Sequence, residues 1–100
     1  MKKVINGKLY NTDTATPLAS RCEHHGDFRS VDESLYRTKK GSYFLAGSGG
    51  PMSKYAVACD NGWSGGSDII PITEEEARGW AERYCDADEY AAVFGMPEEA

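Results

Sequence analysis

Residues 34–46 read Ser34-Leu-Tyr-Arg-Thr-Lys-Lys-Gly-Ser-Tyr-Phe-Leu-Ala46, and they contain the clearest secondary-structure pattern in the chain. Both arms, 34–38 and 42–46, carry aromatic residues that favour strands. Gly41 can take the left-handed backbone conformation that a short turn requires. The stretch therefore predicts a β-hairpin, and with it an antiparallel sheet.

Upstream of this hairpin, the pattern favours further short strands. The pair Asn6-Gly7 separates two β-prone runs and is typical of a tight hairpin turn. Residues 14–20 can form an edge strand, because Pro17 lacks the N–H that a central strand would donate. We expect the segment from Cys22 to Gly26 to be a loop.

Downstream, glycine-rich segments alternate with short apolar ones. Residues 47–51 and 60–66 contain most of the glycines in this part of the chain, and we expect both to be loops. Residues 55–58 can pair briefly between them. Residues 67–72 predict a last strand, which Pro71 closes.

Two helices are expected after the strands. The Thr73 hydroxyl can accept from the amide of Glu76 while the Glu76 carboxylate accepts from the amide of Thr73, which forms a capping box. At the helical period, one inward stripe follows: Ala77, Trp80, Ala81 and Tyr84.

A second, short helix should begin at Asp86 and end at Gly95 before Pro97. Its expected inward residues are Tyr90, Val93 and Phe94. The predicted class is α+β, with a small antiparallel sheet of about four to five strands followed by a C-terminal pair of helices packed on one face. We expect a single domain over 1–100, in which 1–73 is mainly β with glycine-rich loops, 74–95 is helical and acidic, and 96–100 is a frayed tail.

Charge is distributed unevenly along the chain. Residues 74–100 contain nine acidic and two basic residues, whereas residues 1–73 contain seven acidic and nine basic ones, and the whole chain carries a net charge of −5. An acidic end favours a basic protein surface as the partner and disfavours direct binding to nucleic acid. Five carboxylates are the candidate partner-binding residues: Glu75, Glu82, Asp86, Asp88 and Glu89.

Two motifs could indicate catalysis or metal binding, but each lacks part of the pattern that its chemistry requires. We therefore expect a non-enzymatic protein. Residues 62–66 fit the pattern Gly-x-Ser-x-Gly, yet no helix follows directly and both histidines precede the serine. Cys22, His24 and His25 offer zinc-binding donors without paired ligand spacing, so a metal site through them remains an alternative. We expect no catalytic residue, no metal and no cofactor.

The lysines and cysteines admit simple interpretations. Lys2, Lys3, Lys39 and Lys40 can serve solubility and edge protection, or form a nucleic-acid patch with Tyr36 and Tyr43 as stacking platforms.

Three widely separated cysteines are typical of a reducing compartment. No apolar run is long enough to span a membrane, so we expect a cytoplasmic protein. We also expect it to be a monomer.

Several stretches resemble small uncharacterised proteins of bacterial prophages and mobile elements. They are Met1-Lys-Lys-Val-Ile-Asn-Gly-Lys-Leu-Tyr10, Leu35-Tyr-Arg-Thr-Lys-Lys-Gly-Ser-Tyr-Phe-Leu45, Gly49-Gly-Pro-Met-Ser53, Ile69-Ile-Pro-Ile-Thr-Glu-Glu-Glu-Ala77 and Asp86-Ala-Asp-Glu-Tyr90. The resemblance carries no catalytic set. By analogy of class, it implies an anti-CRISPR-type inhibitor whose carboxylates imitate nucleic acid and block DNA binding by a CRISPR effector complex in the host cytoplasm. The alternative is a protein-interaction or regulatory module of a mobile element, bound through the hairpin 34–46.

Overall fold

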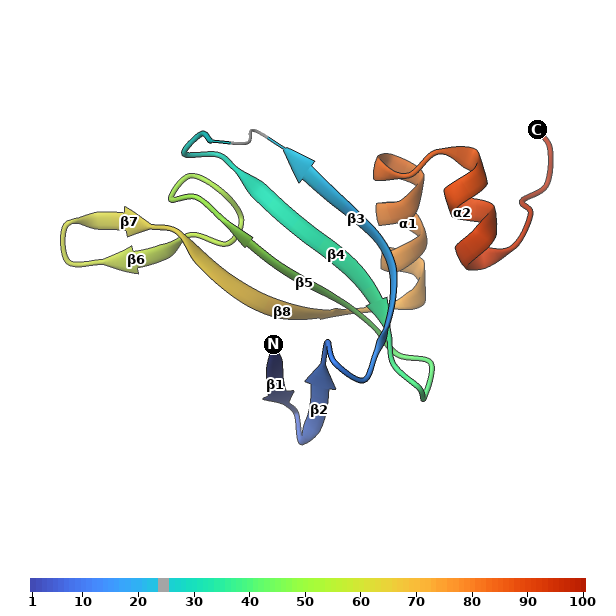
Figure 1. The fold of residues 1–100 in the computed structure, drawn as a ribbon, viewed down its shortest axis with the longest axis horizontal. Coiled ribbons are helices and arrows are strands. Elements are labelled where there is room, and N and C mark those ends of the chain that lie inside the picture. Colours follow the sequence, from blue (N-terminus) through green and yellow to red (C-terminus); the bar gives the residue numbers. More distant parts are fainter. Residues whose placement is uncertain (24–25) are drawn as a thin grey trace.

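The structure, a computed structural model, describes residues 1–23 and 26–100 and contains three antiparallel sheets and two helices (Figure 1). The strands are β1 (Lys2–Ile5), β2 (Lys8–Asn11), β3 (Thr16–Glu23), β4 (Val31–Arg37), β5 (Tyr43–Gly49), β6 (Val57–Cys59), β7 (Gly62–Ser64) and β8 (Gly66–Ile72). The helices are α1 (Glu74–Tyr84) and α2 (Ala87–Phe94). The predicted α+β class is confirmed.

The main sheet has four strands in the order β3-β4-β5-β8, all antiparallel. The predicted hairpin forms its centre, with Leu35 opposite Leu45 and Tyr36 opposite Phe44. The remaining strands form two small hairpins, β1–β2 and β6–β7. The predicted sheet of about four to five strands is confirmed by the main sheet, and the described residues contain two further hairpins, each with its own ladder.

One face of the main sheet carries the helical pair. Leu35, Tyr43 and Leu45 are buried there against α1, which contributes Ala77, Trp80 and Ala81 to the same core cluster. Tyr84 of α1 and Tyr90 and Phe94 of α2 are partly buried against this cluster. The predicted inward stripe of α1 is confirmed. Val93 is half-buried, and no residue of α2 is fully buried.

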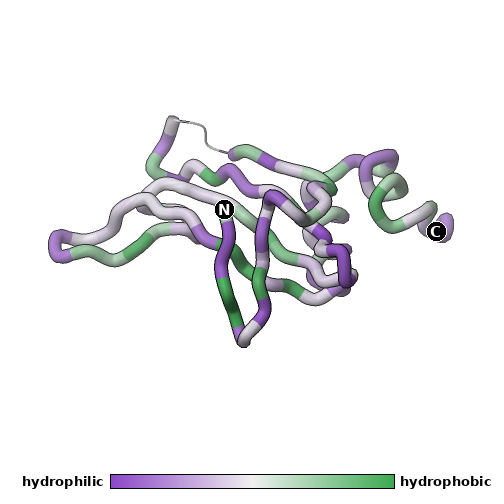
Figure 2. The backbone as a smooth tube through the Cα atoms, turned by 60° about the horizontal axis from the view of Figure 1, so that its bottom comes forward, coloured by the Kyte–Doolittle hydropathy of each residue, from purple (hydrophilic) through white to green (hydrophobic). Residues whose placement is uncertain are grey.

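The opposite face of the sheet is covered in part by the β1–β2 hairpin. Phe44 is fully buried on this face, where it stacks on Tyr36 with ring centroids 5.1 Å apart and meets the edge of Tyr10 at 5.6 Å. The hairpin turns through Asn6 and Gly7, both with positive φ, as its sequence predicts. In Figure 2 this hairpin projects from the sheet with hydrophilic and hydrophobic segments alternating along it.

The glycine-rich segments are more ordered than expected. Gly47, Ser48 and Gly49 continue β5, and residues 62–64 form β7. The expectation of two loops was therefore wrong at these positions. Glycine is used here because segment 50–56 folds back onto the strands: a Cβ on Gly47 would lie 2.6 Å from the Tyr55 hydroxyl oxygen, and one on Gly66 would lie 2.7 Å from the Tyr55 carbonyl oxygen.

The first and last β-strands of the main sheet also differ from expectation at their ends. Cys22 and Glu23 belong to β3 and pair with Asp32 and Val31, so the loop expected there was wrong at these two positions. Pro71 lies inside β8 opposite Phe44. Both β3 and β8 are edge strands of this sheet, which is where a missing backbone donor is tolerated.

Both helices begin at the predicted caps, Thr73 and Asp86. Each start is a capping box, which the sequence analysis expected only at Thr73. The Thr73 hydroxyl accepts from the amide of Glu76 at 3.1 Å, and the Glu76 carboxylate accepts from the amide of Thr73 at 3.0 Å. Asp86 and Glu89 repeat the arrangement at 2.8 and 3.2 Å. Gly95 ends α2 with a φ of +89°, a conformation that favours glycine.

Candidate functional site

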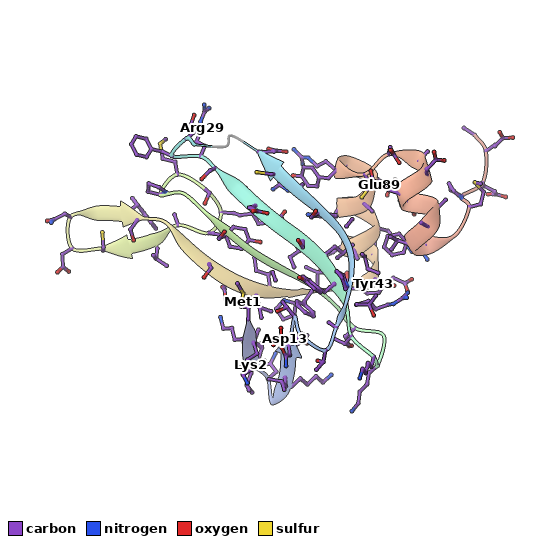
Figure 3. The ribbon with its side chains drawn as sticks, in the orientation of Figure 1. Met1, Lys2, Asp13, Arg29, Tyr43 and Glu89 are labelled. Carbon is purple, nitrogen blue, oxygen red and sulfur yellow. The ribbon has the colours of Figure 1, made fainter. Side chains whose placement is uncertain are left out.

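The five candidate carboxylates all belong to the helical pair, two on α1 and three at the start of α2, and all are exposed. We call them the acidic helical surface: Glu75, Glu82, Asp86, Asp88 and Glu89. Figure 3 labels Glu89 on this pair, whereas Lys2 lies on the separate β1–β2 hairpin. The predicted surface is therefore accessible to a partner.

The five carboxylates differ in their positions on the helices and in their hydrogen bonds. Glu75 and Glu82 are seven residues apart on α1, so at about 100° per residue they share the side directly opposite the buried stripe. Asp86 and Glu89 each use one carboxylate oxygen in the capping box of α2. Their charge remains at the surface, but their side chains are held in place by the backbone. Asp88 lies in the first turn of α2, where the helix dipole favours a carboxylate.

Arg78 connects the two helices and does not neutralise Glu82. Its Nε lies 3.4 Å from a Glu74 carboxylate oxygen, its guanidinium lies 4.8 Å from the Phe94 ring centroid, and Nη1 donates to the Tyr90 hydroxyl at 3.5 Å. Glu82 is also four residues from Arg78, but among the described residues Arg78 pairs only with Glu74. Glu82 is exposed and has no ion-pair partner among the described residues.

The acidic helical surface also affects a neighbouring thiol. Cys85 lies between the two helices and is half-buried. Burial raises its pKa above the usual value, and the charges of Glu89 and Asp86 raise it further. This thiol is therefore a natural reporter of the negative field at the helical pair.

A second cluster of charge, which the sequence analysis missed, surrounds Glu33 on β4. Glu33 is only 1 % exposed. Its carboxylate accepts from the Tyr55 hydroxyl at 2.5 Å, from the Trp80 indole at 2.8 Å and from Arg21 Nε at 2.8 Å, and Lys54 Nζ lies 2.9 Å away. These partners come from segment 50–56, α1 and β3. Glu33 thus connects segment 50–56 and α1 to the sheet, and also connects β4 to its neighbouring strand β3.

The partners keep Glu33 ionised despite its burial. Burial opposes the charged form, but the four donors outweigh it and lower the pKa of Glu33 to about 2. Burial and the hydrogen bond to Glu33 raise the pKa of Tyr55 above its usual value, so its hydroxyl remains a donor. The Arg21 guanidinium has two further contacts. Its Cζ lies 3.9 Å from the Tyr84 ring centroid, and its Nη1 lies 2.9 Å from a Glu23 carboxylate oxygen.

A sequence signal for this cluster exists. Val31, Glu33 and Leu35 alternate along β4, and both apolar neighbours are buried. Period-two alternation places Glu33 on the same inward face. Its nearly complete burial makes it a structural anchor for the helices and not a group that a substrate can reach.

The two alternative chemical motifs gain no support from the geometry that is described. Ser64 lies on β7, which leads into strand β8 and not into a helix. Cys22 is exposed at the end of β3, while His24 and His25 fall outside the described residues. Within residues 1–23 and 26–100, no three His, Cys, Asp or Glu side chains gather closely enough to hold a metal ion.

Three comparisons add no relative. No family model, no curated protein and no solved structure matches this chain. Among the described residues, neither helix is long and apolar enough to cross a membrane.

Proposed function

We propose that this chain is a non-enzymatic inhibitor of anti-CRISPR type, which acts in the host cytoplasm by presenting its acidic helical surface to the basic nucleic-acid channel of a CRISPR effector complex. The carboxylates take the place of phosphates, and target DNA is excluded from the channel. No cofactor takes part, and the chain itself makes no contact with nucleic acid through this surface.

One observation carries the proposal: Glu75, Glu82 and Asp88 are exposed and have no ion pair among the described residues. Duplex DNA carries one charge per about 1.7 Å of its axis, so a protein that imitates it needs closely spaced, uncompensated anions. Nine acidic against two basic residues in 74–100 meet this requirement. The Glu33 cluster supports it by fixing Trp80, and with it α1, to the sheet.

The mechanism predicts fast and salt-sensitive association. Opposite charge on the two surfaces steers their encounter, and salt screens that attraction with a Debye length of about 10 Å at 0.1 M. The affinity for the effector complex should therefore fall as ionic strength rises. An affinity that is independent of salt contradicts the mimicry.

The experiment compares target-DNA binding by purified CRISPR effector complexes with and without the protein. The test variant is Glu75→Gln, Glu82→Gln and Asp88→Asn, which removes three charges and leaves both capping boxes intact. Its matched control is Asp13→Asn, Asp32→Asn and Asp60→Asn, three exposed acids of the β region with no ion pair among the described residues. Both variants change the net charge equally.

We expect the native chain and the control to inhibit DNA binding and the helical variant to lose inhibition. Far-UV circular dichroism and the urea midpoint establish that all three proteins fold alike. Equal inhibition by the helical variant, or no inhibition of any effector complex by the native chain, rejects the proposed function.

A further inference from the structure

A groove on the other side of the sheet from the helical pair has the opposite charge. It lies between the tip of the β1–β2 hairpin and the turn that joins β4 to β5, and has a volume of about 580 Å³. Three lysines line it, Lys8 from the hairpin and Lys39 and Lys40 from the turn. We call it the lysine groove.

Among the described residues, none of these three lysines forms an ion pair. The ion pairs of the described residues involve Lys3 and Lys54 but not Lys8, Lys39 or Lys40. No carboxylate lines the groove. Three like charges that face one hollow repel one another, and a low-dielectric wall focuses their field into it. An anion in the groove would relieve this repulsion.

Both walls are held by local structure. In the β4–β5 turn, Thr38 N donates to Ser42 O at 2.7 Å, Ser42 N donates to the Thr38 hydroxyl at 3.0 Å and Gly41 N donates to Thr38 O at 2.9 Å. On the other wall, Asn6 and Gly7 hold positive φ angles immediately before Lys8. The cations are therefore carried by two ordered turns that do not need to form when a ligand binds.

The rest of the lining suits a phosphorylated ligand. Thr14, Thr38 and Ser42 bring side-chain hydroxyls, and Tyr10 brings a half-buried ring that packs edge-on against Phe44. Lysine ammonium groups bind phosphate as point charges, and hydroxyl groups add hydrogen bonds. An anion that neutralises both walls must reach from one wall to the other. Several linked phosphate groups span that distance better than a single phosphate group does.

We propose that the lysine groove binds ligands with two or more linked phosphate groups. The phosphates bridge Lys8 on one wall to Lys39 and Lys40 on the other. This site goes beyond the proposed function, because it uses a different face of the molecule and the opposite charge. The linked phosphates can belong to a small polyphosphate or to a single nucleic-acid strand, and the two sources are separated by the test.

The test titrates the full chain with inorganic triphosphate by calorimetry and with a short labelled single-stranded oligonucleotide by fluorescence anisotropy. The groove variant Lys8→Gln/Lys40→Gln removes one charge from each wall. The matched control Lys2→Gln/Arg83→Gln removes two charges from exposed cations outside the groove. The urea midpoint verifies that both variants fold.

For whichever probe binds, we expect the groove variant to weaken binding at least about tenfold, and the slope of log affinity against log salt to fall by about one for each lysine. The control should bind like the native chain. Binding of triphosphate alone assigns the groove to small polyphosphates, and binding of the oligonucleotide assigns it to a strand, against the expectation that the chain avoids nucleic acid. Failure of both probes to bind the native chain, or equal losses in both variants, overturns the proposal.

Discussion

Trp80 of α1 donates its indole N–H to the Glu33 carboxylate of β4 at 2.8 Å, although 47 residues separate them in the chain. This hydrogen bond joins the helical end of the protein to the centre of its sheet. Because the acceptor is a buried, ionised carboxylate, the bond is charge-assisted and stronger than one between neutral groups. The acidic helical surface is positioned through this contact.

Replacing Glu33 by Gln should destabilise the protein by about 3 kcal/mol. The change leaves Arg21 and Lys54 without their buried counter-charge, and breaking one partner of a buried ion pair costs about that much. Urea denaturation of native and variant protein measures the loss. Glu23→Gln is the control, since Glu23 is exposed and should change the stability by no more than about 1 kcal/mol. A Glu33→Gln variant as stable as the native chain would contradict the anchor role.

The stability that Glu33 contributes should disappear in acid. Its folded pKa of about 2 lies below the ordinary value of 4.5, so the contribution is complete above about pH 5 and is lost as pH falls toward 2. The linked free energy is about 3 kcal/mol at most. Urea midpoints of the native chain and of Glu33→Gln, measured across this range, should converge as pH falls. Parallel curves would show that Glu33 titrates normally.

Two Gly→Ala changes should have opposite signs. In Gly47→Ala the new methyl group would lie 2.6 Å from Glu33 Cβ and 2.6 Å from the Tyr55 hydroxyl, so we expect a loss of about 2 kcal/mol. In Gly79→Ala the methyl group meets nothing within 4 Å, and the helix should gain up to about 1 kcal/mol. Thermal unfolding of both variants checks the pair. Similar behaviour of the two would mean that Tyr55 does not lie against β5.

The cap of α2 can be separated from its charge. Asp86→Ala removes the side chain that accepts from the Glu89 amide and should cost about 1 kcal/mol. Asp86→Asn keeps the acceptor, loses the charge and should stay within about 0.5 kcal/mol of the native chain. Denaturant unfolding with circular dichroism at the helical band compares them. If Asn is as damaging as Ala, the carboxylate charge, and not the cap, stabilises α2.

The Cys85 thiol should report the field of the acidic helical surface. Glu89→Gln removes a charge that raises the Cys85 pKa, so the thiolate fraction and the rate of alkylation near pH 8 should increase. The measurement uses a background with Cys22→Ser and Cys59→Ser, because both of these thiols are exposed. Glu98→Gln, in the exposed tail, serves as the charge-matched control. An unchanged rate in Glu89→Gln would mean that the Glu89 charge does not raise the Cys85 pKa.

Sequence reasoning located the elements whose information is local. The 34–46 hairpin, the Asn6-Gly7 turn, the capping box at Thr73 and the cap at Asp86 were predicted because turn geometry and helix caps depend on residues within a few positions of one another. It misjudged the glycine-rich segments 47–49 and 62–64. At Gly47 and Gly49, glycine marks a strand that segment 50–56 approaches closely, and such an approach is a property of the folded chain. Gly62 has no such neighbour and instead has a positive φ in the β6–β7 hairpin.

Three features can be read from the sequence: the α+β order, the inward stripe of α1 and the concentration of acidic residues in the last third of the chain. Three others depend on tertiary contacts: the burial of Glu33 among cations and aromatic donors, the bridge that Arg78 makes from α1 to α2, and the position of Lys8 opposite Lys39 and Lys40 across one groove. The physical reason is distance along the chain. Caps, turns and helix faces follow from neighbours in sequence, whereas the partner of a charge is set by which strands and helices meet in space.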